Sequence, residues 1–179
     1  KAIYIREPGA AAISEKIRKV LLDGRNHSMS AVCEMLLYMA ARNQIVEEVI
    51  KPALDKGCVV VSDRFLDSTL AYQGYGLGMD ISFIRYIGNV VTAGIKPGLT
   101  ILLDLPVKKG LIHRQANKDR IEKRSLAYHS RVRKGYLRLA QDEPQRIKIV
   151  KVEKSKKITQ EKIRNLAMHF INVTFKNVV

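Results

Sequence analysis

The feature of this sequence that most limits its fold is the uninterrupted apolar run Cys58-Val59-Val60-Val61, which follows a long helical pattern. Such a run is typical of a strand in a parallel sheet that helices cover on both faces. Three more stretches have the composition of short strands: residues 1–5, 99–105 and 146–150. Because strands and helical patterns alternate along the chain, we predict an α/β fold with a parallel sheet flanked by helices.

Apolar residues at helical spacing predict helices at 13–22, 29–56, 81–93, 108–117, 125–141 and 158–170. In the longest of these, we expect a buried stripe made of Cys33, Leu36, Leu37 and Ala40. Pro52 should kink or interrupt this helix, because its ring clashes with the preceding turn.

Composition limits the class of protein. The chain has 179 residues, 46% of them apolar, which suits a single domain over 1–179. No apolar run approaches the ~20 residues of a membrane span, and no secretory leader is recognised. Only two cysteines occur, which suits a reducing compartment. We therefore expect a cytoplasmic protein without a membrane partner.

The net charge of +15 favours anionic ligands such as nucleotides or nucleic acid, although a solvated basic surface explains it equally well. No zinc-finger spacing or ribonucleoprotein motif accompanies the charge, so we do not expect nucleic acid as a partner.

Two pairs of charged residues follow predicted strands. Arg6-Glu7 comes after the first strand, and Asp63-Arg64 after the second. Ligands of open α/β sheets bind at the carboxyl ends of the strands, where an arginine can grip a phosphate with two N–H bonds. A carboxylate there can hold Mg²⁺ through water. Purely structural arginine–carboxylate contacts are an equally good interpretation of each pair alone.

Two further groups of polar residues are candidates for ligand binding. Tyr38 and Arg42 share a helix face and together can bind a base, although a core-edge aromatic with a solvated arginine is the commoner arrangement. Ser68, Thr69, Tyr72 and Gln73 offer hydroxyl, phenol and amide groups within two helical turns. Their alternative interpretation is helix capping.

The charged segment at about 112–125 contains Arg114, Lys118, Arg120 and Glu122. A basic lid of this kind can close over transferring phosphates and exclude water. A polar connection between two helices is the alternative.

Taken in order, these segments resemble the thymidylate kinase family of nucleoside monophosphate kinases. The matching residues are Arg6-Glu7-Pro8-Gly9, 36–42 (LLYMAAR), 49–54 (VIKPAL), 62–65 (SDRF), 68–74 (STLAYQG), 96–100 (KPGLT), 119–122 (DRIE) and 129–137 (HSRVRKGYL). The resemblance implies a three-layer P-loop NTPase-type fold over 1–179. It implies phosphorylation of dTMP to dTDP with ATP and Mg²⁺, by an enzyme that commonly forms homodimers.

The resemblance also implies roles for individual residues. Arg64 would hold the dTMP phosphate and, with Arg114, Lys118 and Arg120, act in catalysis. Asp63 would lie near Mg²⁺ through water, and Glu122 would be nearby. The dTMP site would contain Arg6, Glu7, Tyr38, Arg42, Arg64, Ser68, Thr69, Tyr72 and Gln73. Within it, Tyr38 would stack on thymine, and Tyr72 would lie under the deoxyribose and disfavour a 2′-hydroxyl.

The sequence departs from the family in two places. The P-loop pattern G-x-x-x-x-G-K-[ST] does not occur in it, and we expect the family's first strand and P-loop to lie upstream of Lys1. That strand would fill the middle of the sheet, between the strands at 58–62 and 99–104, and without it we expect little turnover. Ala10 replaces a glycine usual in the family, which is expected to alter the loop around Arg6 and Glu7.

Two other functions remain open from the sequence. One is a kinase for a different nucleoside monophosphate. The other is a catalytically inactive paralogue that binds nucleotide or nucleic acid without a P-loop.

Overall fold

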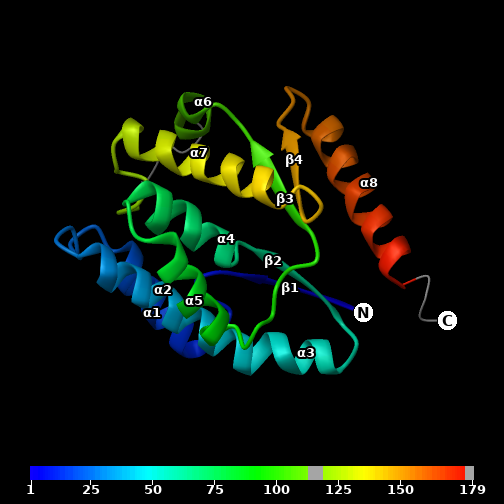
Figure 1. The fold of residues 1–179 in the computed structure, drawn as a ribbon, viewed down its shortest axis with the longest axis horizontal. Helices are drawn as coiled ribbons and strands as arrows, with labels where there is room; N and C mark the ends of the chain where they lie inside the picture. Colours follow the sequence, from blue (N-terminus) through cyan, green and yellow to red (C-terminus); the bar gives the residue numbers. More distant parts are fainter. Residues whose placement is uncertain (113–118, 176–179) are drawn as a thin grey trace.

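Four strands form two separate parallel pairs in the structure, a computed structural model that describes residues 1–112 and 119–175 (Figure 1). β1 (Ala2–Arg6) pairs with β2 (Val59–Asp63), and β3 (Thr100–Asp104) pairs with β4 (Ile147–Lys151). All four predicted strands are therefore present and parallel, and the α/β prediction is confirmed.

The two strand pairs do not join into one sheet. No hydrogen bonds link β2 to β3 among the described residues, and a cavity of about 680 Å³ lies between them. Val61 of β2 and Leu103 of β3 line this cavity and remain 51% and 50% exposed. The prediction that these strands are buried on both faces is therefore wrong here, because each has one unpaired edge along the cavity.

Helices surround the strand pairs. They are α1 (Ala12–Leu22), α2 (Ala31–Ile45), η1 (Val46–Ile50), α3 (Lys51–Asp55), α4 (Leu66–Thr69), η2 (Leu70–Gly76), α5 (Ile81–Val91), α6 (Val107–Ile112), α7 (Leu126–Asp142) and α8 (Lys156–Phe175). The η segments are π-helical. Within the described part of the chain, no helix has both the length and the apolar content to cross a bilayer.

The long helical pattern at 29–56 continues through Pro52, but not as a regular α-helix. The turn before the proline widens into the π-helical η1, where the Lys51 amide donates to the Val46 carbonyl. This wider turn accommodates a ring that would clash inside a regular α-helix. The predicted interruption is thus a π-turn, after which α3 continues.

α2 buries a different face from the predicted one. Cys33, Leu36 and Ala40 are exposed, whereas Met35 and Met39 are buried. The helix is turned because it also buries two charged residues, Glu34 and Arg42, each with an ion-pair partner from another segment.

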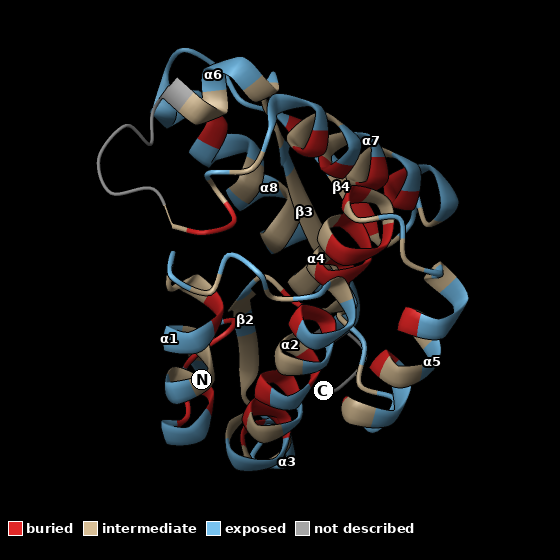
Figure 2. Cartoon of the chain, turned by 90° about the vertical axis from the view of Figure 1, so that its left-hand side faces the viewer, coloured by how far each residue is buried: buried red, intermediate tan, exposed pale blue. Residues whose placement is uncertain are grey.

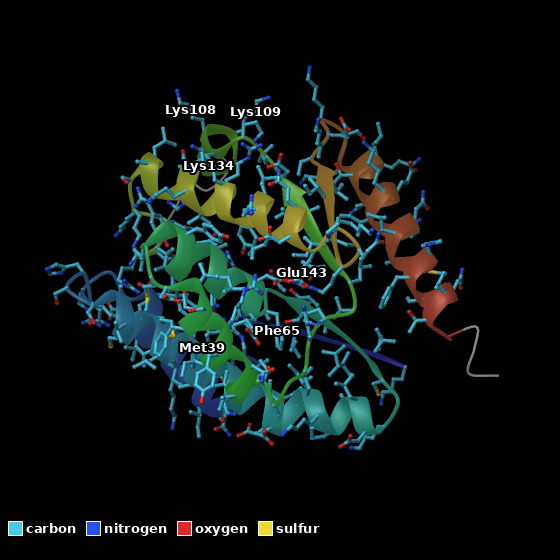
Figure 3. All side chains as sticks on the ribbon, viewed as in Figure 1. Met39, Phe65, Lys108, Lys109, Lys134 and Glu143 are labelled. Atoms are coloured by element: carbon cyan, nitrogen blue, oxygen red, sulfur yellow. The ribbon has the colours of Figure 1, made fainter. Side chains whose placement is uncertain are left out.

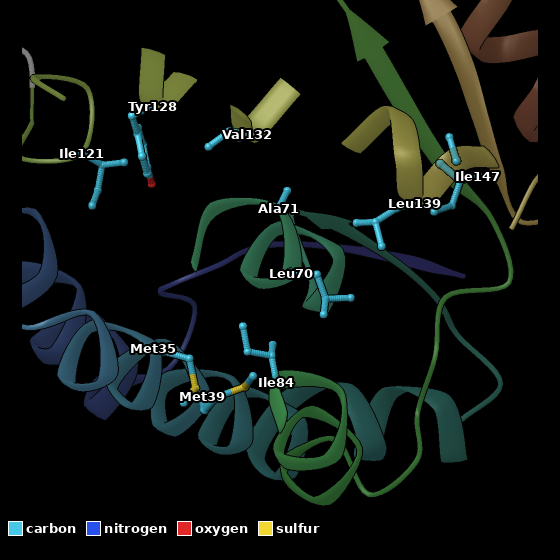
Figure 4. Close-up of a cluster of buried hydrophobic side chains, with 11 residues drawn as sticks. Met35, Met39, Leu70, Ala71, Ile84, Ile121, Tyr128, Val132, Leu139 and Ile147 are labelled. Carbon is cyan, nitrogen blue, oxygen red and sulfur yellow. The ribbon is translucent and has the colours of Figure 1, made fainter. Parts of the chain in front are cut away.

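The larger core cluster joins α2, α5, η2, α7 and β4 (Figure 4). Buried residues line the surfaces where these helices face one another, while their outer faces are exposed (Figure 2). The clustered side chains are Met35, Met39, Leu70, Ala71, Ile84, Ile121, Tyr128, Val132, Leu139, Ala140 and Ile147.

α7 packs directly on η2. Two glycines allow the close approach: a Cβ on Gly135 would lie 2.6 Å from the Cβ of Tyr75, and one on Gly76 would lie 2.7 Å from the Tyr128 ring. Residues 68–73, expected within two helical turns, do lie in a helical segment, and this segment continues through Gly76 as η2.

Part of the positive charge is plainly solvated. Lys108 and Lys109 of α6 and Lys134 of α7 are exposed and extend from the ribbon into solvent, in contrast to Met39 and Phe65 in the interior (Figure 3).

Candidate active site

The carboxyl ends of the strands meet at a second cavity, of about 560 Å³. Arg6 at the end of β1 lies opposite Asp63 at the end of β2, because the two strands pair in parallel register. Asp104, at the end of β3, lines the same cavity. The charged residues predicted at the strand ends are therefore brought together.

Most of the predicted site residues line this cavity. They are Arg6, Glu7, Tyr38, Arg42, Asp63, Arg64, Ser68, Thr69, Tyr72, Gln73 and Glu122. Arg114 and Lys118 lie outside the described residues. Arg120 is described but does not line the cavity.

Arg64 directly follows the last residue of β2, and its side chain is fixed by several contacts. Its backbone has φ +73°, a left-handed conformation that is uncommon for a residue with a side chain. The guanidinium donates to the Ser68 hydroxyl at 2.9 Å and to the Tyr72 hydroxyl at 3.4 Å, and it lies 4.9 Å from the centre of the Tyr72 ring. These contacts orient a permanent positive charge in the cavity.

Aromatic rings form one wall of the cavity. Tyr72 packs edge-to-face on Tyr128 and Tyr136, with ring centres 6.3 and 6.2 Å apart. On another side, burial, reinforced by the charge of Glu34, raises the pKa of Tyr38 to about 12. The Tyr38 phenol is therefore neutral at physiological pH and suited to stacking on a base.

Glu7 and Arg42 form a buried ion pair that lines the cavity. The Nε of Arg42 donates to Oε2 of Glu7 at 2.8 Å, and Arg42 is only 2% exposed. Burial raises the pKa of the Glu7 carboxyl, and the guanidinium of Arg42 opposes this shift. Oε1 of Glu7 has no hydrogen-bond partner among the described residues, so it is able to accept one from a ligand.

The loop after β1 keeps the conformation that a glycine would favour. Ala10 has φ +66°, and its amide donates to Oε1 of Glu15 at 3.0 Å. The same carboxylate oxygen lies 3.4 Å from Nη2 of Arg6. Arg6 is half exposed and is positioned by this contact.

Gln73 lines the cavity, but its amide nitrogen donates to a residue outside the cavity lining. Nε2 donates to Oε1 of Glu34 at 2.8 Å. Nη2 of Arg124 donates to the other oxygen of the same carboxylate at 2.7 Å. Glu34 itself does not line the cavity.

Arg120 is buried and does not line the cavity, so in this structure it is not placed to contact a transferring phosphate. Its Nη2 lies 2.5 Å from Oε2 of Glu34, and its Nε donates to the Leu21 carbonyl at 2.8 Å. The physical reason is that Glu34, fully buried on α2, needs positive partners. Here Arg120 anchors the segment after residue 118 to α1 and α2.

The chain is similar to known proteins over most of its length. Residues 1–163 match the thymidylate kinase family profile. A thymidylate kinase of Geotalea daltonii is 49% identical over 159 residues, which cover 84% of this chain and 74% of that protein. One from Symbiobacterium thermophilum is 43% identical over 175 residues, covering 97% of this chain and 82% of that protein. The chain belongs to the thymidylate kinase family.

The fold agrees with that assignment. A crystal structure of thymidylate kinase from Ehrlichia chaffeensis superposes with a TM-score of 0.76 at 26% identity, covering 93% of this chain and 80% of that one. The P-loop NTPase-like α/β class expected from the family resemblance is thereby confirmed.

One carboxylate at the strand ends, that of Asp63, is suited to hold the Mg²⁺ expected for a thymidylate kinase. Asp63 lines both cavities, and its carboxylate makes no hydrogen bond or ion pair with another described residue. No group of three or more potential ligands occurs among the described residues. Mg²⁺ in kinases is bound through one or two carboxylates together with substrate phosphates. Asp63 fits the ion; Glu122 lines the same cavity.

Several residues in this site and next to it were not predicted from the sequence. Asp104 accepts two hydrogen bonds from Arg133, at 2.7 and 2.8 Å, and both residues line the cavity. Glu34 was also missed, although a signal was present: Glu34, Tyr38 and Arg42 are four residues apart and share one helix face.

Proposed function

We propose that this protein transfers the γ-phosphoryl group of ATP to dTMP, giving ADP and dTDP, with Mg²⁺ as the metal. Family membership supports the reaction class. Phosphoryl transfer requires mainly the alignment of two nucleotides and positive charge on the transferred group. The cavity at the strand ends supplies cations and an aromatic wall, which suits the acceptor nucleotide.

The observation that carries the proposal is the placement of Arg64. Its guanidinium is oriented by Ser68 and Tyr72 and shares the cavity with Asp63. A fixed guanidinium binds a phosphate with two parallel N–H bonds and thereby sets the direction of its oxygens. We assign to Arg64 the dTMP phosphate.

The remaining wall suits the nucleoside. Tyr38 is positioned to stack on the base, and Thr69 and Gln73 line the cavity where they would meet its edge. The family resemblance places the Tyr72 ring, which packs on Tyr128 and Tyr136, under the sugar, where it would disfavour a 2′-hydroxyl. This arrangement favours a deoxyribonucleotide.

Asp63 is the residue we assign to Mg²⁺, through a bound water. The ion would neutralise phosphate charge as it develops. In our assignment this chain's own residues bind the acceptor, orient its phosphate and limit access of water.

A coupled assay for ADP release tests the function, on protein that includes the P-loop segment expected upstream of Lys1. We expect ADP formation that depends on dTMP and is absent with UMP. Arg64→Ala should lower kcat/KM at least about tenfold, a loss of ~1.4 kcal/mol or more. Arg138→Ala, which removes an exposed guanidinium that does not line the cavity, is the matched control and should leave kcat/KM unchanged.

Two outcomes contradict the proposal. Unchanged kinetics for Arg64→Ala would refute the role of this residue. If dTMP raises the melting temperature but produces no ADP, the chain binds the nucleotide without turning it over, as the inactive-paralogue alternative requires.

A further inference from the structure

A buried carboxylate lies behind the base end of the cavity. Glu34 of α2 is 0% exposed and joins three segments of the chain. Gln73 of η2 donates to its Oε1 at 2.8 Å, while Arg120 and Arg124 lie 2.5 and 2.7 Å from its Oε2. None of these contacts is used by the phosphate-transfer chemistry assigned above.

This carboxylate decides which way the amide of Gln73 faces. An ionised carboxylate only accepts hydrogen bonds, whereas an amide has one donating and one accepting end. Because Glu34 accepts from the Nε2 end, the carbonyl oxygen of Gln73 is turned away from it. No described residue donates to that oxygen, and Gln73 lines the cavity. The site therefore offers a fixed acceptor to a ligand.

The two arginines hold the carboxylate of Glu34 in place. Arg124 is itself held by the Tyr128 hydroxyl, at 2.9 Å, and its guanidinium lies 4.7 Å from the centre of that ring. Arg120 is fixed to the Leu21 carbonyl. Both arginines lie at Oε2, and Nη1 of Arg124 also donates to Oε1 at 3.2 Å, so the carboxylate is held in the orientation in which Oε1 accepts from Gln73 at 2.8 Å.

We propose that Glu34 is a positioning residue that selects the nucleobase, an inference that rests on the proposed function. The fixed carbonyl of Gln73 accepts a hydrogen bond from the ring N–H of thymine or uracil. Cytosine carries a lone pair at that ring nitrogen and meets repulsion instead. Discrimination against cytosine is thus determined by a residue that does not touch the ligand.

The test compares dTMP and dCMP binding by calorimetry in the full chain. In Glu34→Gln, residue 34 can donate as well as accept, so the Gln73 amide is free to turn. We expect the Kd ratio of dCMP to dTMP to fall about tenfold or more. In the wild type the Gln73 carbonyl has no donor opposite it when cytosine is bound, and in the variant the amide can turn and remove that penalty. A merely structural role would weaken both nucleotides equally and leave the ratio unchanged, which would overturn the inference.

Arg124→Gln is the matched control. It removes a cation from the same cluster but keeps the bond between Glu34 and Gln73, so the Kd ratio should stay as in the wild type. A fall of the ratio equal to that of Glu34→Gln would assign discrimination to the cluster's charge and refute the amide mechanism.

Loss of folding is checked by circular dichroism. Should Glu34→Gln unfold, Glu34→Gln/Arg120→Gln removes both buried charges and is read in the same way. Independently, NMR of the wild type should show contacts between the Gln73 amide protons and the Glu34 side chain with and without dTMP; their loss on dTMP binding overturns the inference. A wild type that binds no dTMP contradicts the proposed function, whereas a wild type that discriminates while Glu34→Gln keeps the ratio contradicts only the inference.

Discussion

Removal of Arg146 should destabilise the protein more than removal of any surface arginine. This residue precedes β4, is 11% exposed on its side chain, and donates to both oxygens of Asp67 on α4, at 2.7 and 2.8 Å. It also donates to the Thr100 hydroxyl of β3 and to Glu143. It therefore ties the segment that follows Arg64 to the second strand pair.

The magnitude follows from its two carboxylate partners. Hydrogen bonds from Arg146, assisted by Lys96, lower the pKa of Glu143 from 4.5 to about 2. A shift of that size corresponds to at most ~3.4 kcal/mol of stability at pH 7, because solvent screens part of the interaction, and Arg146 contributes the larger part. Asp67 would be left buried without its partner. For Arg146→Gln we expect a loss of about 3–5 kcal/mol in the free energy of unfolding.

The same reasoning fixes the pH dependence. The Glu143 pKa is lower in the folded chain than in the unfolded one, so its contribution is present above pH 4.5 and is lost as the pH falls toward 2. At pH 3.5 its share is smaller by ~1.4 kcal/mol than at pH 7. The difference in the free energy of unfolding between the wild type and Arg146→Gln should therefore be smaller at pH 3.5 than at pH 7.

Urea unfolding followed by circular dichroism, at pH 7 and pH 3.5, measures both effects. Arg138→Gln is the control, because its ion pair with Asp142 is exposed, 64% on the arginine, and should contribute ~0–0.5 kcal/mol. A loss for Arg146→Gln no larger than that of the control, or a gap that does not narrow in acid, would refute the reasoning.

Three further predictions concern packing, backbone and assembly. Gly135→Ala should cost about 1–3 kcal/mol, since its Cβ would meet Tyr75, whereas Gly110→Ala meets only ordinary contacts and should be neutral or slightly stabilising; urea unfolding compares them. Ala10→Gly should raise the melting temperature by a few degrees, because it relieves ~1 kcal/mol at a positive φ; an unchanged or lower value contradicts this. We also propose a homodimer through the exposed apolar side chains of α2 and α5, so light scattering should give twice 20.2 kDa, and Tyr86→Lys should give the monomer mass.

The sequence predicted those parts of the protein that local rules govern. Strands end at polar pairs, and parallel strands bring these ends together, so the meeting of Arg6, Asp63 and Arg64 followed from pattern alone. The buried face of α2 did not, because burial of Glu34 and Arg42 depends on partners 35 to 90 residues away in the sequence. Hydropathy assigns such residues to the surface.

The extent of the helical segment that contains Gly74 and Gly76 also depends on distant partners. Gly74 and Gly76 indicate a turn when considered locally, yet they lie in a helix because Ile81, Tyr128 and Val132 approach their backbone closely. Glycine is required at these positions because the facing side chains leave no space for a Cβ, and local sequence propensity carries no information about those facing side chains.

The segment 64–76 follows β2 directly and includes cavity-lining residues such as Arg64 and Gln73. Its position also depends on contacts with elements beyond the first strand pair. Asp67 is tied to β3 and β4 through Arg146, Gln73 to α2 through Glu34, and Gly76 to α7 by direct packing. The two strand pairs share no backbone hydrogen bonds among the described residues, so these contacts help fix their separation. A substitution that loosens any of the three ties should therefore weaken dTMP binding as well as stability, even though Arg146 and Glu34 lie outside the cavity lining.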